Sequence, residues 1–233
     1  MNFLNYTQNV EPTAGFSAGI INQRVSNIDG RDADGYHTET YSTTENQVYF
    51  SFGNRISRFV SLGVSSKLYY AKLFEKMSST TVGFDVGLLI RPKEMFAIGF
   101  VAQDLGSKYL WDSKPLYQEN GRPSKDKFPT LQRLSITYNL PSQIGIVSFE
   151  WETSNHNTSI LRGGIEVYIE EHFVLRGGFD RYDLKDEFAG AKPTFGFSLY
   201  PPFEDLKTTV HYAYLVEPFS PAGAHILAIS FFP

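Results

Sequence analysis

Apolar and polar residues alternate with a period of two along most of the chain. The pattern is clearest between Val82 and Ile90, where Val82, Phe84, Val86, Leu88 and Ile90 share one face and Gly83, Asp85 and Gly87 share the other. The alternation resumes with Phe96, Ile98 and Phe100 after the segment Arg91–Glu94. A period of two is typical of a β-strand with two different faces, so this stretch predicts a hairpin.

The same alternation predicts further strands along the chain. They lie at Ala14–Arg24, Asn46–Asn54, Phe59–Ala71, Leu131–Asn139, Gly145–Glu152, Ile160–Ile169, Phe173–Arg181, Thr194–Tyr200, Leu206–Leu215 and Ala224–Phe232. About twelve strands result, most of them near the ~9–11 residues with which a tilted strand crosses a bilayer. No amphipathic helix of convincing length is predicted.

The connections between these strands alternate between short and long. Short connections are predicted at Arg55–Arg58, Arg91–Glu94, Pro141–Ile144, Glu170–His172 and Pro201–Asp205. Long ones are predicted at Val25–Glu45, Lys72–Thr80, Asp104–Thr130, Thr153–Ser159, Tyr182–Pro193 and Val216–Gly223. Outer-membrane barrels have short periplasmic turns and longer external loops. This rule places both chain ends on the periplasmic side and predicts an even number of strands.

Composition separates a membrane barrel from a soluble one. Aromatic residues make up 15% of the chain and glycine occurs 19 times, while the mean hydropathy is only -0.24. No run approaches the ~20 apolar residues of a membrane-spanning helix. A soluble sandwich or lipocalin-like barrel is the alternative, but Phe, Tyr and Trp151 are too numerous for one small core. We therefore predict a single all-β domain over residues 1–233, an antiparallel up-and-down transmembrane β-barrel in a Gram-negative outer membrane.

Charge and cysteine content limit the partners and the compartment. The net charge of -4 gives no basic surface for nucleic acid. Cysteine is absent, which excludes disulfides but fits several compartments. The segment Met1–Val10 lacks the pattern of a signal peptide, so we expect either a protein that is not exported or a piece of a longer precursor.

Four segments in order resemble the PorV/PorQ-like family, relatives of the FadL-type barrels. They are SLGVSSKLYYAKL (Ser61–Leu73), GFDVGLLIRPKEMFAIGFVAQDLG (Gly83–Gly106), ILRGGIEVYIEEHFVLRGGFD (Ile160–Asp180) and GAHILAISFFP (Gly223–Pro233). The chain departs from the family in lacking its N-terminal segment and first strands, at Val167-Tyr168, and at Pro233. These departures lead us to expect an N-terminally truncated barrel. How such a barrel would close does not follow from the sequence.

The resemblance implies an outer-membrane barrel of the type IX secretion pathway that docks cargo and protein partners. The partners expected from it are the lipid bilayer and proteins bound through the long outer loops, above all Asp104–Thr130 with Trp111 and Tyr117. The alternative is a FadL-like channel for hydrophobic small molecules. The small, polar inner face predicted here favours docking.

Four motifs could indicate chemistry, and each has a simpler interpretation. Gly15–Gly19 matches a nucleophile elbow, but strand pattern continues after it. The five His residues lack zinc-ligand spacing. The acidic segment Asp29–Gly35 lacks the acids that an EF-hand loop needs, and Glu150 with Glu152 is interpreted as water-facing or interfacial charge. We therefore expect no catalytic, metal or cofactor site, and no enzyme.

Polar residues that alternate with apolar neighbours are the candidates for the barrel lumen. They are Lys67, Asp85, Arg133, Arg162, Glu166, Arg176, Asp180, Lys207 and His211. The opposite face should meet lipid, with Val86, Phe100, Ile136, Phe149 and Phe197 as its clearest members.

One hairpin allows its register to be predicted. Directly opposed residues of an antiparallel pair have a constant sum of residue numbers, and opposite charges placed there are favourable. A single register opposes Arg162 to Asp180, Gly164 to Gly178 and Glu166 to Arg176. It leaves Glu170–His172 as the loop and opposes Ile169 to Phe173.

Overall fold

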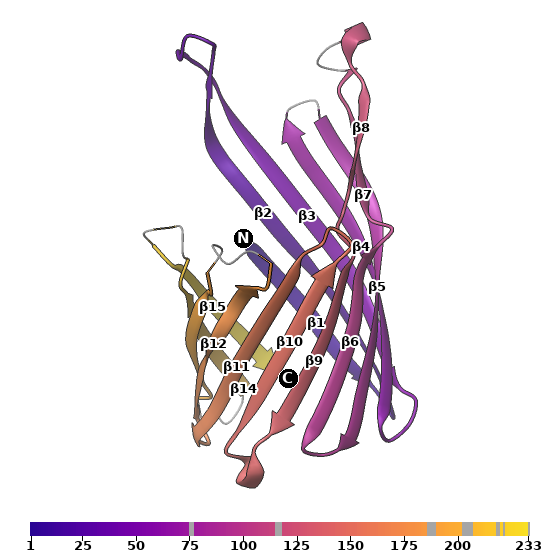
Figure 1. Ribbon diagram of the computed structural model, residues 1–233, viewed down its shortest axis with the longest axis vertical. Helices are drawn as coiled ribbons and strands as arrows, with labels where there is room; N and C mark the ends of the chain where they lie inside the picture. Colours follow the sequence, from indigo (N-terminus) through magenta and orange to yellow (C-terminus); the bar gives the residue numbers. More distant parts are fainter. Residues whose placement is uncertain are drawn as a thin grey trace. The chain divides into compact units, whose positions relative to one another are not determined.

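The computed structural model describes residues 1–74, 77–114, 118–185, 190–201, 207–217, 220 and 222–232. It is almost entirely β-structure (Figure 1). The strands are β1 (Asn2–Val10), β2 (Ala14–Arg31), β3 (His37–Arg55), β4 (Val60–Phe74), β5 (Met77–Lys93), β6 (Phe96–Leu105), β7 (Lys108–Asp112), β8 (Pro123–Lys127), β9 (Leu131–Asn139), β10 (Gly145–Ser154), β11 (Ser159–Glu170), β12 (Phe173–Asp183), β13 (Pro193–Leu199), β14 (Lys207–Leu215) and β15 (Ala224–Phe232). Two short 3-10 helices, η1 (Gln118–Asn120) and η2 (Pro141–Gln143), lie in connections.

Thirteen strands form one sheet in the order β1-β2-β3-β4-β5-β6-β9-β10-β11-β12-β13-β14-β15. Strands β7 and β8 form a separate two-stranded sheet within the connection from β6 to β9. All twelve predicted strands are found, and β1 is an additional one whose weak alternation did not reveal it. The large sheet in the described part of the chain therefore has an odd number of strands, and the predicted even number is wrong. The antiparallel all-β fold class is confirmed. In the described part of the chain, no helix has the length and apolarity required to traverse a membrane.

The chain divides into two compact units. The first comprises Met1–Leu88 and Ala102–Thr130, and the second comprises Leu89–Val101 and Leu131–Pro233. In the first unit, the tip of the β2–β3 hairpin and the β7–β8 hairpin lie at the same end of the strands (Figure 1). In the second unit, β9 to β12 run side by side (Figure 1).

The strands of the first unit are longer than the alternation indicated. Most of Val25–Glu45, predicted as a loop, continues the ladder of β2 and β3, with Val25 opposite Thr43 and Ile28 opposite Tyr41. Only the residues around Asp32–Tyr36 form the turn. Backbone hydrogen bonds still hold these strand ends together, but both their faces meet water, so no apolar period marks them.

The two faces of the sheet differ in the way that a bilayer requires. Val86, Phe100, Ile136 and Phe149 are all exposed, as predicted for lipid-facing residues. The ring of Phe197 lies on the same face, within 6.1 Å of Phe173 and 5.4 Å of Tyr212 between ring centroids. The buried residues of the opposite face include charged and polar ones, namely Lys67, Asp85, Glu152, Ser198 and Thr209. The fold is thus apolar outside and polar on its more protected face.

The predicted register of β11 and β12 is confirmed over the centre of the hairpin. Gly164 lies opposite Gly178 and Glu166 opposite Arg176. The register shifts by one residue between Leu161 and Gly163, so the predicted opposition of Arg162 to Asp180 is not a pair of the ladder, although the two side chains still contact at 3.6 Å. It shifts again between Tyr168 and Glu170. Phe173 therefore lies opposite Glu170 instead of Ile169, and the loop is shorter than predicted. Irregularities of this kind re-aim a side chain at the end of a ladder, and sequence alternation does not reveal them.

Candidate functional site

A compact ion cluster occupies the polar face of the first unit. The Nζ atom of Lys67 on β4 lies 2.8 Å from Oδ2 of Asp85 on β5 and 3.2 Å from Oδ1 of Asp104 on β6. The Tyr69 hydroxyl donates to Asp104, and the Asp104 backbone N–H donates to Asp85 over 3.0 Å. These side chains are largely buried, so Lys67 compensates carboxylates that water does not reach well.

The β7–β8 hairpin folds back onto the same unit. The backbone N–H of Leu110 donates to Ser79 on β5 over 2.9 Å. The Trp111 indole is buried and donates to Asp126 over 2.7 Å. Burial raises the pKa of Tyr109 to about 12, and its ring meets Phe128 edge-on. Trp111 is therefore committed to contacts within the chain. Tyr117, also expected to meet a partner, lies outside the described residues.

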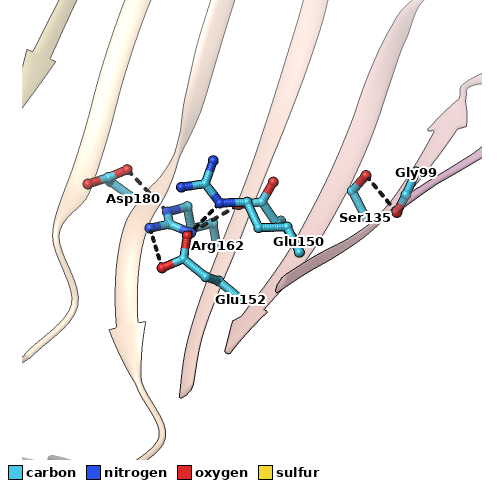
Figure 2. Close-up of polar contacts among 7 residues, drawn as sticks. Gly99, Ser135, Glu150, Glu152, Arg162 and Asp180 are labelled. Atoms are coloured by element: carbon cyan, nitrogen blue, oxygen red, sulfur yellow. Dashed lines mark hydrogen bonds and ion pairs between the residues drawn. The ribbon is translucent and has the colours of Figure 1, made fainter. Parts of the chain in front are cut away.

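A network of two arginines and three carboxylates crosses β9 to β12 in the second unit (Figure 2). Arg162 on β11 contacts Glu150 at 2.9 Å, Glu152 at 3.1 Å and Asp180 at 3.6 Å. Arg133 on β9 donates from Nε to Glu152 over 2.5 Å. The side chain of Glu152 is only 5% exposed. It is thus the central acceptor of the network.

A second polar network follows along β11 to β14. Arg176 on β12 donates to Glu166 on β11 and, from Nη1, to Ser198 on β13. Ser198, which is fully buried, lies 2.6 Å from Nδ1 of His211 on β14. The register sets these contacts, since Glu166 faces Arg176 and Ser198 faces His211 across adjacent strands.

A cavity of about 570 Å³ opens on the polar face beside this second network. Strands β9 to β15 all contribute to its lining. The glycine row of the cavity consists of Gly164 and Gly178, which lie opposite one another, whereas Gly196 lies opposite Arg176 in the next row. A Cβ added at Gly164 would meet only the carbonyl oxygen of Gly177, at 3.5 Å. The absence of side chains at this row leaves the hollow. Glu166, Arg176 and His211 supply its charged and polar wall.

The structure brings the residues nominated from sequence into three groups. Lys67 and Asp85 meet in the first unit, Arg133, Arg162 and Asp180 meet around Glu152, and Glu166, Arg176 and His211 form the network beside the cavity. Lys207 begins β14, but its side chain lies outside the described part of the structure.

Five partners of these residues were not nominated: Tyr69, Asp104, Glu150, Glu152 and Ser198. The two glutamates alternate with Phe149 and Trp151 and could have been found by the rule that selected the others. Ser198 is uncharged, so the same rule did not select it.

The motifs weighed for other chemistry have structural roles. Gly15–Gly19 lies inside β2, where Ser17 bonds to Asn5 and Thr7 of β1. Asp29 contacts Arg31 and His37, each at 2.6 Å. Within the described ranges, no group of three or more His, Asp or Glu side chains could hold a metal ion.

Comparison with solved structures identifies the fold. The chain is similar to the toluene transporter TbuX of Ralstonia pickettii, with a TM-score of 0.64 and 13% identity over 95% of this chain and 77% of that one. It is similar to the toluene transporter TodX of Pseudomonas putida, with a TM-score of 0.64 and 11% identity over 97% of this chain and 80% of that one. A FadL homologue of Pseudomonas aeruginosa matches with a TM-score of 0.62 and 11% identity, over 98% and 75%.

No protein-family model and no curated protein sequence matches the chain. The similarity to these solved structures shows that the chain has the fold of FadL-type barrels.

The main functional prediction from sequence is wrong. Resemblance to PorV/PorQ implied docking in type IX secretion, but the solved structures that match nearly the whole chain are FadL-type transporters and channels of hydrocarbons. The docking surface expected on Asp104–Thr130 also includes a tryptophan buried against its own hairpin.

Proposed function

We propose that this protein is an outer-membrane channel for small hydrophobic molecules and not an enzyme. The observation that carries the proposal is the match to hydrocarbon transporters over 95% of the chain or more, which spans both units. The cavity of about 570 Å³ supports it, because small-molecule sites usually measure about 300–1,000 Å³.

In this proposal, the thirteen-stranded sheet forms one barrel domain and its polar face lines the interior. The lumen would then contain the residues nominated from sequence, Lys67, Asp85, Arg133, Arg162, Glu166, Arg176, Asp180, Lys207 and His211. Their pairing supports this placement, because paired charges let a polar wall form without leaving an uncompensated ion.

Uptake by whole cells tests the proposal. The chain is expressed in Gram-negative cells that lack their own FadL-type channel, and entry of radiolabelled toluene is followed over time. Faster entry than in cells with an empty vector is expected, because the lipopolysaccharide leaflet slows apolar solutes and a barrel bypasses it.

A pentose of similar size serves as the control for leakage and should enter no faster than in empty cells. Folded protein is verified by its heat-dependent migration in gel electrophoresis. Toluene entry unchanged in cells with folded protein, or an equal acceleration for the pentose, would contradict a hydrophobic channel.

A further inference from the structure

The cavity in the second unit has a mostly apolar wall with a small polar part. Its apolar part comes from Ile146, Ile226 and Ala228 together with the glycine row, and its polar part comes from Glu166, Arg176 and His211. A pure hydrocarbon would offer no partner to a polar atom of this part that is not already paired within the chain, and burying an unpaired polar group is unfavourable.

The charges around the cavity are already compensated. Arg176 is paired with Glu166, and Arg133 and Arg162 share Glu150, Glu152 and Asp180. These three arginines thus face four carboxylates, so this part of the wall has an excess of negative charge. A ligand carboxylate would find no uncompensated cation among them and would meet repulsion.

A hydrogen-bond relay ends at the cavity. Arg176 can only donate, so Ser198 accepts from it and can pass its own hydroxyl proton toward Nδ1 of His211. A neutral His211 that accepts at Nδ1 carries its proton on Nε2. Among the described residues, no hydrogen bond is made by this Nε2, while His211 lines the cavity.

We infer that the cavity binds neutral amphipathic molecules, each with a small apolar body and one hydroxyl or carbonyl oxygen, which accepts a hydrogen bond from Nε2 of His211. This inference rests on the proposed channel function and specifies its substrate class. The apolar body would lie along the glycine row, where Gly164 has room beside it.

Binding to the purified protein in detergent tests the inference with three ligands of one shape. Toluene, para-cresol and para-toluate share a methylated ring and differ in having no polar group, a hydroxyl or a carboxylate. Isothermal titration should show para-cresol binding about tenfold more tightly than the other two, the effect of about one net hydrogen bond. Tightest binding of para-toluate, or equal binding of toluene and para-cresol, would overturn the inference.

Two substitutions at position 211 separate recognition from packing. His211→Phe keeps a ring but loses the donor, so the preference for para-cresol over toluene should fall to about twofold or less. His211→Gln keeps an N–H donor and should retain most of the preference. Equal weakening of both ligands by His211→Phe would make the residue a packing element only and would overturn its assigned role.

Two glycine substitutions, one in the cavity and one outside it, test where the binding site lies. Gly164→Leu should abolish binding of both ligands by filling the cavity, whereas Gly63→Leu should leave it unchanged. The control is matched, since an added Cβ at Gly63 on β4 also meets only a carbonyl oxygen, that of Phe52 at 3.6 Å, outside the cavity. Unchanged binding in folded Gly164→Leu would place the site elsewhere and overturn the inference.

Failure of the inference is distinguishable from failure of the channel. If toluene uptake by cells is accelerated but the preference for para-cresol is missing, only the substrate class is wrong. If uptake is not accelerated for toluene or para-cresol, the proposed function itself fails.

Discussion

Glu152 shows how a single residue organises the polar face of the second unit. Its carboxylate accepts from Arg133 and Arg162, which reach it from the strands on either side of β10. Removing water from an ion costs several kcal/mol, and only close partners with good geometry offset that cost. The buried carboxylate and the two arginines therefore depend on one another.

Replacement of Glu152 tests this dependence. Glu152→Ala removes the buried carboxylate that Arg133 and Arg162 share and leaves them only the more exposed Glu150 and Asp180, so it should lower the free energy of unfolding by about 3–5 kcal/mol. The measurement is urea unfolding in lipid vesicles, followed by tryptophan fluorescence. Glu150→Ala is the control, since its side chain is 30% exposed and its loss should cost about 1 kcal/mol or less. Equal effects of the two changes would remove Glu152 from the centre of the network.

At the scale of single residues, the sequence identified residues of the polar face where a charged residue alternates with apolar neighbours. Arg162, Glu166 and Arg176 stand out in this way. The contact of Glu166 with Arg176 follows from the register of β11 and β12, and that of Arg162 with Glu150 follows from the register of β10 and β11. Glu150 and Glu152 obey the same rule, but their flanking aromatic residues made an interfacial position equally reasonable. The contact of Ser198 with His211 depends on the pairing of β13 with β14, which composition does not encode.

Elements were predictable within the bilayer and less so beyond it. The β11–β12 register emerged from sequence because a slip of one residue would turn charges toward lipid. The outer halves of β2 and β3 escaped prediction because water on both faces removes that constraint. The β7–β8 hairpin was hidden for the same reason, since Lys, Asp and Ser alternate without an apolar face in Pro123–Lys127.

Strand β9 offers a test of the two faces through adjacent residues. Ile136 is exposed on the apolar face, and Thr137 lines the cavity on the other. Ile136→Arg should cost about 2–4 kcal/mol of stability because its charge would enter lipid. Thr137→Arg should cost clearly less. The two variants are compared by urea unfolding in vesicles, and a Thr137→Arg protein that is the less stable of the two would reverse the assignment of faces.

At the scale of the whole molecule, sequence predicted the architecture better than the function. Alternation and loop lengths led to an antiparallel β-barrel of the outer membrane, and the similarity to FadL-type structures confirms the fold. The functional prediction relied on short motifs, and barrel strands of different proteins converge on such motifs because lipid and water impose the same alternation. The identity to the FadL-type structures is only 11–13%, so the similarity to them lies in the course of the whole chain and not in short motifs.

Topology across the membrane can be tested without background labelling, because the chain contains no cysteine. Asp34→Cys and Glu119→Cys should react with an impermeant maleimide on intact cells, since both positions belong to long connections predicted to lie outside. Glu94→Cys, in a short turn, should react only after the outer membrane is disrupted. All three residues are exposed, so access depends on the side of the membrane. The reverse pattern would invert the predicted orientation.

The strand order also has a consequence for how the protein assembles. Each strand of the large sheet pairs with its successor in the chain, except where β9 joins β6 past the β7–β8 hairpin. Pairings between successive strands close short loops, and folding rates rise as contacts become more local. We therefore expect growth one hairpin at a time, with the β6–β9 joint as the slow step. The β7–β8 hairpin shortens the span that this step must close, so its internal pairing would set the pace at which the later strands are added.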